Sequence, residues 1–252
     1  MPNSPIIGLT MRLELETNRF YLGRDYSEAL EYFGAVPLHI PLIPNRHTIK
    51  ELVKNLDGIL LPGSDSDIDP SHYSEDPHPF LKKVVPEKDL TDLLILEEAE
   101  KLNLPVLAIC FGMQALNVHK GGSLIQDIGS QIKNPIKHEQ GLPLDRLSHN
   151  IKVKNRSRLS SYTKQKGLNG NIKVNSHHHQ SVKEVGKNLT ATAWTNDGMI
   201  ECIEGVDKNR FVLGLQWHPE ISFKNDPLSR EIFKAFVEEC RKFATNRGRF
   251  SE

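Results

Sequence analysis

Hydrophobic residues in the first half of the chain fall into two alternating patterns. Short, mostly apolar runs at residues 6–10, 58–61 and 106–109 predict strands, and the continuous apolar run at 106–109 suits a strand buried on both faces of a parallel sheet. Between them, residues 25–33 and 88–102 repeat their apolar positions with the spacing of amphipathic helices. Strand and helix therefore alternate, which predicts an α/β fold with a mostly parallel central sheet and helices on both of its faces.

Weaker patterns fill the remainder of this half. Residues 35–41 predict a strand, and their prolines place it at an edge of the sheet or at a strand end. Residues 48–55 predict a short helix, whereas the polar and aromatic segment 14–21 predicts a loop over the functional site. Residues 65–86 repeat Asp, Pro, Ser and His without periodicity, which predicts a long surface loop of the kind that often carries function.

The second half of the chain changes to shorter apolar segments, most of which alternate with polar residues. Such segments predict a small antiparallel patch with one face exposed to water. A polar loop is predicted over 130–148, and the spacing in 229–243 predicts a closing helix. No internal repeat and no linker interrupt the pattern, so residues 1–252 are expected to form a single domain. The predicted short strands are 124–128, 150–153, 171–174, 189–194 and 199–203.

Composition narrows the class of protein. Lys and Arg together number 32, as do Asp and Glu, so the formal charge is zero, which argues against sequence-independent attraction to nucleic acid or to anionic membranes. Three cysteines without paired spacing fit a reducing compartment better than a disulfide framework. The chain has no run of about 18 apolar residues, so no transmembrane helix is expected. Residues 1–5 do not resemble a signal peptide, and we expect a cytoplasmic protein.

One candidate nucleophile stands out from this pattern. The apolar run at 106–109 stops abruptly at Cys110, and residues 112–117 then predict a helix that the glycines at 121–122 end. A cysteine at a sharp strand-to-helix turn is a nucleophile elbow, because the turn lifts the side chain above the sheet edge and the helix N-terminus favours the thiolate. A lone cysteine is more often a small core residue, so this pattern alone leaves the role of Cys110 open.

A second apolar run, at 212–215, ends in the cluster Gln-Trp-His-Pro-Glu. His218 of this cluster could take the thiol proton, and Glu220 could orient the imidazole and stabilise its cation. Other histidines could serve as the base, and the sequence does not exclude His178. The remaining cysteines, Cys202 and Cys240, lie on a predicted strand and on the apolar face of a predicted helix, and they are expected to be buried and inert.

The segment Leu-Pro-Gly-Ser at 61–64 closes a predicted strand, so it should lie at the same edge of the sheet as Cys110. Pro-Gly alone indicates an ordinary turn. Beside a cysteine nucleophile, however, it favours an oxyanion hole, in which the backbone N–H groups of Gly63 and Phe111 face the developing charge.

Three adjacent histidines, at 177–179, raise the question of a metal site. Successive residues of a strand point to opposite faces, so at most His177 and His179 would converge. No Cys, Asp or Glu is spaced to complete a tetrahedral set with them. We therefore predict no metal and no cofactor.

These motifs together resemble a known family. Ala-Ile-Cys-Phe-Gly-Met-Gln at 108–114, followed by Gln-Trp-His-Pro-Glu at 216–220, resembles the class I glutamine amidotransferase superfamily. Three further motifs match, in order, its gamma-glutamyl-gamma-aminobutyrate hydrolase branch, the peptidase C26 type. They are Leu-Pro-Gly-Ser at 61–64, Gly-Gly-Ser-Leu at 121–124 and Val-Asn-Ser-His-His-His-Gln at 174–180. The resemblance spans about residues 7–243 and implies a flavodoxin-like three-layer sandwich.

The resemblance implies a catalytic triad of Cys110, His218 and Glu220 and the same two oxyanion donors. It implies a hydrolase that cleaves a small gamma-glutamyl amine, such as gamma-glutamyl-gamma-aminobutyrate, to glutamate and free amine through a gamma-glutamyl thioester. The expected partner is the small-molecule substrate, and a homodimer is compatible with the family. Residues at the glutamyl end of the substrate would be Ser64, Gln114, Ser176, His177 and His178.

Two alternatives and two departures qualify this interpretation. A glutaminase subunit that supplies ammonia to a separate synthase would use the same triad. A non-catalytic binding module on the same fold is disfavoured, because all three triad residues are present. Many amidotransferases have glycine where this chain has Ala108, and the hydrolase branch often has arginine where it has Phe111. The second departure bears on substrate identity more than on the reaction, because the backbone N–H is kept.

Overall fold

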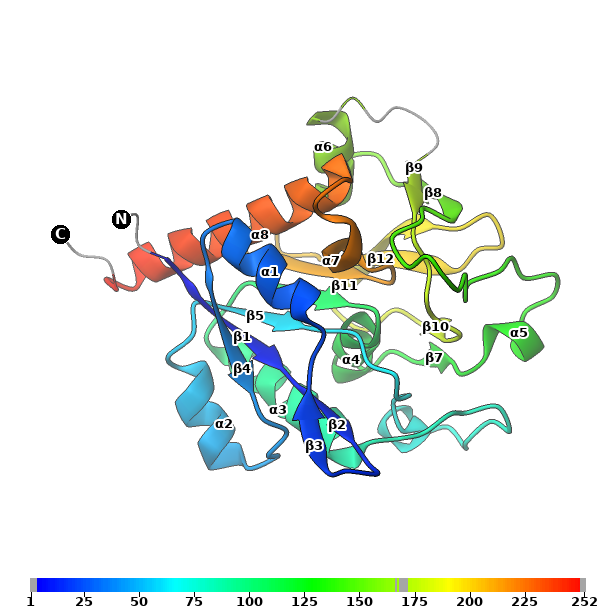
Figure 1. Ribbon diagram of the computed structural model, residues 1–252, viewed down its shortest axis with the longest axis horizontal. Helices are drawn as coiled ribbons and strands as arrows, with labels where there is room; N and C mark the ends of the chain where they lie inside the picture. The colour runs from blue at the N-terminus through cyan, green and yellow to red at the C-terminus, as the bar shows by residue number, and fades with distance from the viewer. Residues whose placement is uncertain (1–3, 166, 168–171, 250–252) are drawn as a thin grey trace.

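The computed structural model describes residues 4–165, 167 and 172–249 of the chain. Within them, one sheet of 11 strands runs through the middle of the molecule between two layers of helices (Figure 1). Its parallel part consists of β1 (Ile6–Thr10), β4 (Val36–Ile40), β5 (Gly58–Leu61), β6 (Val106–Ile109) and β13 (Val212–Leu215). Side by side, these strands lie in the order β4-β1-β5-β6-β13, the flavodoxin-like order of a doubly wound sheet.

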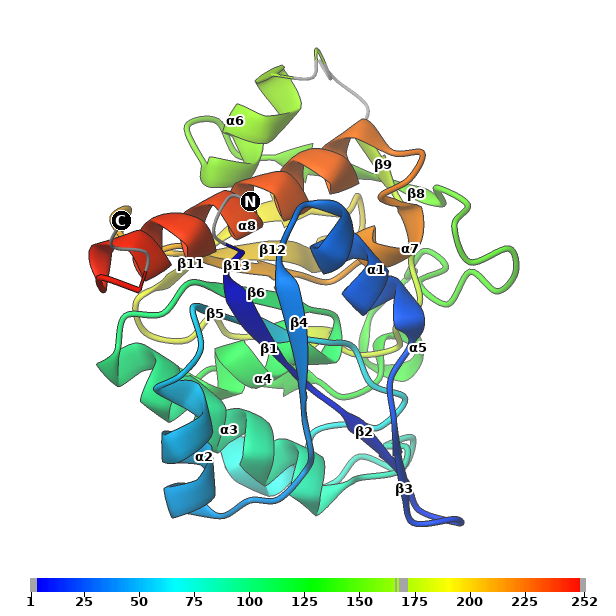
Figure 2. The ribbon, with the colours of Figure 1, turned by 60° about the vertical axis from the view of Figure 1, so that its left-hand side comes forward.

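Helices cover both faces of this sheet, as the strand–helix alternation predicts (Figures 1 and 2). One layer holds α1 (Arg24–Tyr32), α6 (Arg158–Gln165), α7 (Pro219–Ser222) and α8 (Pro227–Asn246). The other layer holds α2 (Arg46–Val53), α3 (Pro86–Lys101) and α4 (Phe111–His119). A hydrophobic core fills the space on each face, so the fold is a flavodoxin-like three-layer sandwich.

Burial explains why the central strands have no polar positions. Every residue of β5 and β6 is buried. Successive side chains point to opposite faces, so Leu60 and Leu107 enter one core while Ile59 and Val106 enter the other. The strand β4 lies at the edge of the sheet, as its prolines predict, because Pro37 has no N–H to donate to a further strand.

The second half forms the predicted antiparallel part of the sheet. After β13 come β12 (Ile200–Gly205), β11 (Leu189–Trp194), β8 (His149–Val153) and β9 (Ile172–Val174). Two shorter strands, β10 (Ser181–Val182) and β7 (Leu124–Ile125), branch from β12. The predicted strand at 171–174 corresponds to β9, although Asn171 itself lies outside the described residues. In contrast to the expected wet face, β12 is buried up to Glu204 and includes the acidic Glu201.

Two local predictions are wrong. Residues 14–21, expected to form a loop, belong largely to a hairpin of β2 (Arg12–Glu14) and β3 (Arg19–Tyr21), which turns at Asn18 with a positive φ of 54°. Residues 124–128, expected to form one strand, divide after Ile125. Asp127 then accepts a hydrogen bond from the Ser130 N–H and begins the short helix α5 (Ile128–Gln131).

Besides α5, the helices α6 and α7 are absent from the sequence-based prediction. The inward side of α6 includes the polar Ser160 and Thr163, so the segment shows no apolar stripe. The long loop at 65–86 is confirmed, with one turn of 3-10 helix, η1 (Pro70–Tyr73). Among the helices of the described residues, none has the length and apolar character needed to cross a membrane.

Candidate active site

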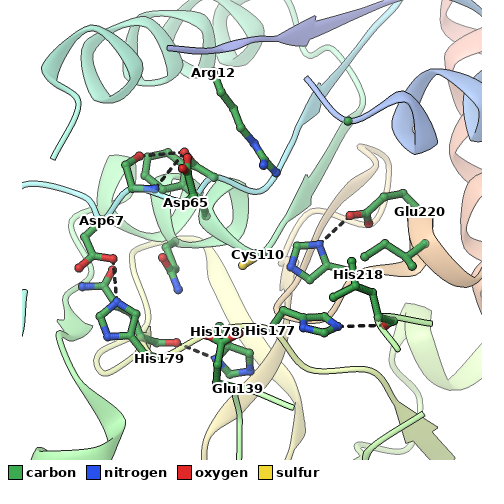
Figure 3. A pocket seen from close by; sticks show the side chains of 18 of the residues that line it. Arg12, Asp65, Asp67, Cys110, Glu139, His177, His178, His179, His218 and Glu220 are labelled. Carbon is green, nitrogen blue, oxygen red and sulfur yellow. Dashed lines mark hydrogen bonds and ion pairs between the residues drawn. The ribbon is translucent and has the colours of Figure 1, made fainter. Parts of the chain in front are cut away.

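The residues that the sequence singles out gather where the parallel strands end. Cys110 follows β6, Gly63 lies just after β5, and His218 lies just after β13. A cavity of about 430 Å³, lined by Cys110 and His218, opens beside them (Figure 3). In doubly wound sheets, ligands bind at this carboxyl edge, near the point where the strand order reverses. The position of the cavity is therefore that of a ligand site.

Cys110 occupies a strained turn between β6 and α4. Its backbone has φ 52° and ψ −110°, a region that residues with a Cβ rarely adopt. Tight packing on both sides maintains the turn: a Cβ at Gly112 would lie 2.2 Å from the carbonyl oxygen of Leu61. The Cys110 N–H also donates to the Leu215 carbonyl at 2.7 Å. This is the geometry of a nucleophile elbow.

His218 and Glu220 form a close pair, and His218 lies beside Cys110 (Figure 3). His218 Nδ1 lies 2.6 Å from Glu220 Oε1, and both side chains are buried. The backbone of His218 is held by Asn175, whose side-chain amide makes hydrogen bonds of 2.8 Å to both its N–H and its C=O. His218 Nε2, which no other described group engages in a hydrogen bond, faces the cysteine.

The charge on His218 follows from these neighbours. Burial by itself would lower the pKa of the imidazole, but the Glu220 carboxylate and the Cys110 sulfur outweigh it and raise the pKa to about 10. An imidazolium beside a cysteine sulfur is the arrangement that activates thiol nucleophiles. His178, the alternative that the sequence leaves open, is neutral, because burial lowers its pKa to about 4. Its Nδ1 lies 2.8 Å from the Gln180 carbonyl, so it does not replace His218 beside Glu220.

Two buried glutamines form a hydrogen-bonded chain to the sulfur. Gln216 Nε2 donates to Cys110 Sγ at 3.5 Å, and Gln114 Nε2 donates to Gln216 Oε1 at 3.2 Å. Gln114 comes from α4 and lines the cavity, whereas Gln216 follows β13. Together they form a short chain of hydrogen bonds that ends on the candidate nucleophile.

Gly63 lies directly against the same pair. A Cβ added to it would stand 2.9 Å from His218 Cε1 and 3.4 Å from Cys110 Cβ, so a larger residue would displace them. Its N–H donates to the Tyr26 hydroxyl at 3.0 Å, and its carbonyl accepts from Arg12 Nε at 2.6 Å. The predicted use of the Gly63 N–H as an oxyanion donor therefore requires the Tyr26 contact to open. The strand pattern could not show this contact, because Tyr26 reaches in from α1.

Phe111, the second predicted oxyanion donor, is the first residue of α4, so its N–H has no acceptor inside the helix. Its ring is buried, and Lys88 Nζ lies 5.0 Å from the ring centroid. Lys88 in turn pairs with Asp92 and donates to Thr10 Oγ1 at 2.9 Å. The Phe111 side chain thus packs on a buried ion pair.

The residues predicted to bind substrate divide into two groups. Ser176 is absent from the described cavity lining: it is buried, its hydroxyl donates to the His138 carbonyl at 2.6 Å, and its N–H donates to Gln140 Oε1 at 2.8 Å. These bonds hold the 130–148 loop, and the substrate-binding role of Ser176 stays a prediction. The segment after β9 is not a regular strand, so alternation does not decide which side chains face the cavity. The lining includes the other four, Ser64, Gln114, His177 and His178.

Four residues near the sulfur had no role assigned from the sequence: Arg12, Tyr26, Asn175 and Gln216. Asn175 and Gln216 belong to the two motifs that carry the family resemblance, so their position in those motifs was an available signal. Arg12 lines the cavity from β2, just before the segment 14–21 that was expected to be a loop. No local pattern distinguishes Tyr26 from the other apolar residues of its helix.

Thiol labelling tests the assignment of the nucleophile. At neutral pH, the first equivalent of iodoacetamide is expected to modify Cys110 and to remove activity in parallel. Cys202 and Cys240 are buried, and burial raises the pKa of each thiol well above its ordinary value, so they should react far more slowly. Peptide mapping by mass spectrometry measures the three sites separately. Equal labelling of all three cysteines in the folded protein would contradict the assignment.

Comparison with known proteins agrees with this geometry. The family model described as Peptidase C26 matches residues 5–220. The chain is 35% identical to the glutamine amidotransferase-like protein YvdE of Lactococcus lactis over 218 residues, which cover 86% of this chain and 88% of that protein. It is 32% identical to the gamma-glutamyl-gamma-aminobutyrate hydrolase PuuD of Escherichia coli K12 over 248 residues, covering 95% of this chain and 94% of that protein.

A solved structure supports the fold independently. A Thermoplasma acidophilum protein, described as one subunit of a GMP synthase, matches with a TM-score of 0.65 and 18% identity, with 98% of each chain covered. The family match includes Cys110, His218 and Glu220. The chain therefore belongs to the peptidase C26 family, a family of hydrolases related to the glutamine amidotransferases.

Proposed function

We propose that this protein is a cysteine hydrolase that cleaves the gamma-glutamyl amide bond of a small gamma-glutamyl amine, such as gamma-glutamyl-gamma-aminobutyrate. The observation that carries the proposal is the position of Cys110, at a strained elbow beside the His218–Glu220 pair. The cavity that this cysteine lines, at about 430 Å³, has room for a glutamyl group and a small amine. Membership of the peptidase C26 family and the likeness to PuuD support the same class of reaction.

In the first half-reaction, the Cys110 thiolate attacks the gamma-carbonyl carbon and forms a C–S bond. The carbonyl oxygen takes up negative charge, which the backbone N–H groups of Phe111 and of the 63–64 turn stabilise. His218 gives its proton to the amine nitrogen as the C–N bond breaks. The amine leaves, and a gamma-glutamyl thioester remains on the sulfur.

In the second half-reaction, water attacks the thioester. His218, now neutral, takes a proton from the water as its oxygen bonds to the carbonyl carbon. The C–S bond then breaks, glutamate is released, and Cys110 leaves as a thiolate beside the protonated imidazole. Glu220 stays ionised throughout, because its role is to orient the ring and to stabilise the cation. These side chains and water make and break every bond.

The cavity carries complementary charges for the alpha-carbon end of a glutamyl group. Arg12 projects into it from β2 (Figure 3), and its guanidinium has donors beyond the Nε that bonds Gly63. We propose that Arg12 binds the substrate alpha-carboxylate. Asp67 and Glu139 line the same cavity and supply negative charge for the alpha-ammonium group.

Substitution of Arg12 tests this assignment. Arg12→Gln is expected to raise KM by about 10–100-fold, with a smaller effect on kcat, because it removes a charged hydrogen bond to a part of the substrate distant from the scissile bond. Arg19→Gln is a matched control, since Arg19 is exposed on the neighbouring strand of the same hairpin. Steady-state kinetics with one gamma-glutamyl amine measure both constants. An unchanged KM in Arg12→Gln would remove Arg12 from the binding site.

A second candidate function is that of a glutaminase subunit that supplies ammonia to a separate synthase. The likeness to a glutamine amidotransferase-like protein favours it. The two functions differ in their substrate and in their need for a partner. Only a stand-alone hydrolase should turn over gamma-glutamyl amines at full rate as a purified chain.

The deciding experiment incubates the purified chain with glutamine and with a panel of gamma-glutamyl amines of different charge. Glutamate and free amine are measured together, so that each turnover is accounted for. The proposal predicts release of both products from at least one gamma-glutamyl amine in preference to glutamine. Turnover of glutamine alone, at a rate that rises with an added synthase, would support the second candidate. No turnover of either substrate class by the folded chain would overturn both.

A further inference from the structure

Four polar side chains from four separate segments meet next to the active-site cavity. His138 comes from the 130–148 loop, His149 from β8, His178 from the segment after β9, and Glu201 from β12. All four are buried, and one nitrogen or oxygen from each lies within 4.8 Å of all the others. Among them, only His178 belongs to the described lining of the cavity. The cluster is thus distinct from the Cys110 site but shares a wall with it.

The spacing of these atoms is too long for hydrogen bonds and suits a shared ligand. Glu201 Oε1 lies 3.8 Å from His138 Nδ1, 3.6 Å from His149 Nε2 and 3.5 Å from His178 Nε2. Around a tetrahedral ion bound at about 2.0–2.1 Å, neighbouring ligand atoms stand about 3.4 Å apart. The three separations from Glu201 Oε1 exceed that value by only a few tenths of an ångström, and the four atoms all lie within 4.8 Å of one another.

The same four atoms lack hydrogen-bond partners within the described chain. His138 Nδ1, His149 Nε2, His178 Nε2 and Glu201 Oε1 are all buried without one. A single unsatisfied buried polar atom costs about 1–3 kcal/mol, so four of them facing one point would be a large penalty. A cation at their centre would satisfy all four at once.

In two of the histidines, the ring nitrogen that faces away from the cluster has a hydrogen-bond acceptor beside it, as is usual for histidines that bind metal. His138 Nε2 lies 3.0 Å from Asp197 Oδ2, and His178 Nδ1 lies 2.8 Å from the Gln180 carbonyl. When those nitrogens carry the protons, the other nitrogen of each ring presents a lone pair to the cluster. A carboxylate or a carbonyl behind a ligating histidine is the usual support of zinc sites.

We propose that His138, His149, His178 and Glu201 bind a divalent transition-metal ion, with Zn²⁺ as the best match. Three imidazoles and one carboxylate suit zinc, whereas Mg²⁺ and Ca²⁺ prefer oxygen ligands in larger numbers. Four protein ligands close the coordination sphere, so the site is structural. It ties the cavity wall at His178 to the neighbouring loop and to two strands.

The sequence-based prediction missed this site for a physical reason. From the sequence, only His177 and His179 of the adjacent histidines were expected to converge, and no Cys, Asp or Glu is spaced to complete a set with them. The fold uses one histidine of the three and recruits the other ligands from distant segments. The metal-free prediction rested on local spacing, which carries no information about such long-range contacts.

The test begins with the metal content of the full, untagged chain purified without chelators. Elemental mass spectrometry of the acid-digested protein is expected to find one zinc per chain. Removal of the metal with a chelator should lower the melting temperature, and added Zn²⁺ should restore it. Replacement by Co²⁺ is expected to give the visible bands of a tetrahedral ion without a thiolate charge-transfer band. That spectrum separates this site from a metal bound at Cys110.

Variants then assign the ligands. His149→Gln and Glu201→Gln are each expected to lower zinc affinity by at least about 100-fold, and Asp197→Asn by about 10–100-fold, because it only supports His138. His119→Gln is the matched control, since His119 also pairs with a carboxylate, Glu100, but lies outside the cluster. If a ligand variant fails to fold, the Co²⁺ spectrum of the unsubstituted chain still shows whether the bound metal has thiolate ligands or not.

Three results would overturn the proposal. The first is a chain without bound metal whose melting temperature does not respond to Zn²⁺ or Co²⁺. The second is a cobalt spectrum with thiolate bands that disappear in Cys110→Ser. The third is full zinc content in folded Glu201→Gln and His149→Gln, because both ligands would then be dispensable. None of these results depends on which substrate the enzyme hydrolyses.

Discussion

Replacement of Cys110 by alanine is expected to lower kcat/KM for gamma-glutamyl hydrolysis by on the order of 10⁴–10⁶-fold. The sulfur forms the covalent bond of the thioester, and the other two cysteines are buried in the core on one face of the sheet. His218→Ala should cause a loss of the same order, because one nitrogen moves the proton in both half-reactions. Steady-state release of glutamate from a gamma-glutamyl amine measures both variants.

Stability measurements separate this loss of chemistry from a loss of fold. Cys110 adopts φ 52°, and strain of this kind costs about 1–3 kcal/mol, which a residue without a Cβ relieves. Cys110→Gly is therefore expected to be inactive yet at least as stable as the unsubstituted chain in thermal unfolding. Cys202→Ala is the matched control: it should keep activity and lose some stability, because it truncates a buried side chain. A folded Cys110→Ala variant with more than about a hundredth of the original rate would refute the assignment.

Glu220→Gln is expected to lower kcat/KM by on the order of 10–10³-fold, less than the loss of Cys110 or His218. The neutral amide keeps part of the orienting contact with His218 Nδ1 but loses the negative charge. Because the charged pair of sulfur and imidazolium can form before substrate arrives, part of the activation survives. Steady-state kinetics of the folded variant measure the loss.

The same substitution is expected to change the pH dependence. The pKa of His218 is raised from 6.5 to about 10, so its proton is available to the leaving amine at neutral pH and is lost as pH rises through about 10. The stability contributed by the charged pair has the same sign: it is complete below pH 6.5 and disappears as pH rises toward 10. Without the Glu220 charge, the alkaline limb of kcat/KM and the loss of stability should both move to lower pH.

A matched control and a contrary outcome define this test. Glu100→Gln removes the carboxylate beside His119, far from the cavity lining, and should leave the activity profile unchanged. An unaltered rate and alkaline limb in folded Glu220→Gln would mean that another acid orients His218. Such an acid could come from the 65–69 loop, in which Asp67 lies 2.9 Å from His179.

The layers of the fold and the places of Cys110 and His218 at the sheet edge follow from local sequence patterns. The unbroken apolar run of β6 indicates burial on both faces, and this conclusion needs no knowledge of its neighbours. Cys110 and His218 each follow such a run closely, so both had to lie at the carboxyl edge of the sheet. Glu220 reaches His218 across only two residues, and this contact is local enough to predict.

The other polar groups around these atoms come from distant segments, and their identity follows from long-range packing. Tyr26 reaches Gly63 from a helix, and His178 lies with histidines from two other segments, although neither contact leaves a local pattern. Ser176 and His178 stand two residues apart in an irregular segment, yet one supports a loop while the other lines the cavity. The periodicity of hydrophobic residues indicates which face of a strand or helix is buried, but it does not indicate which individual groups meet. Hydrogen bonds and metal ligation depend on directions, and on distances that must be correct to within tenths of an ångström. Between segments far apart in the chain, the packing of the fold sets these distances.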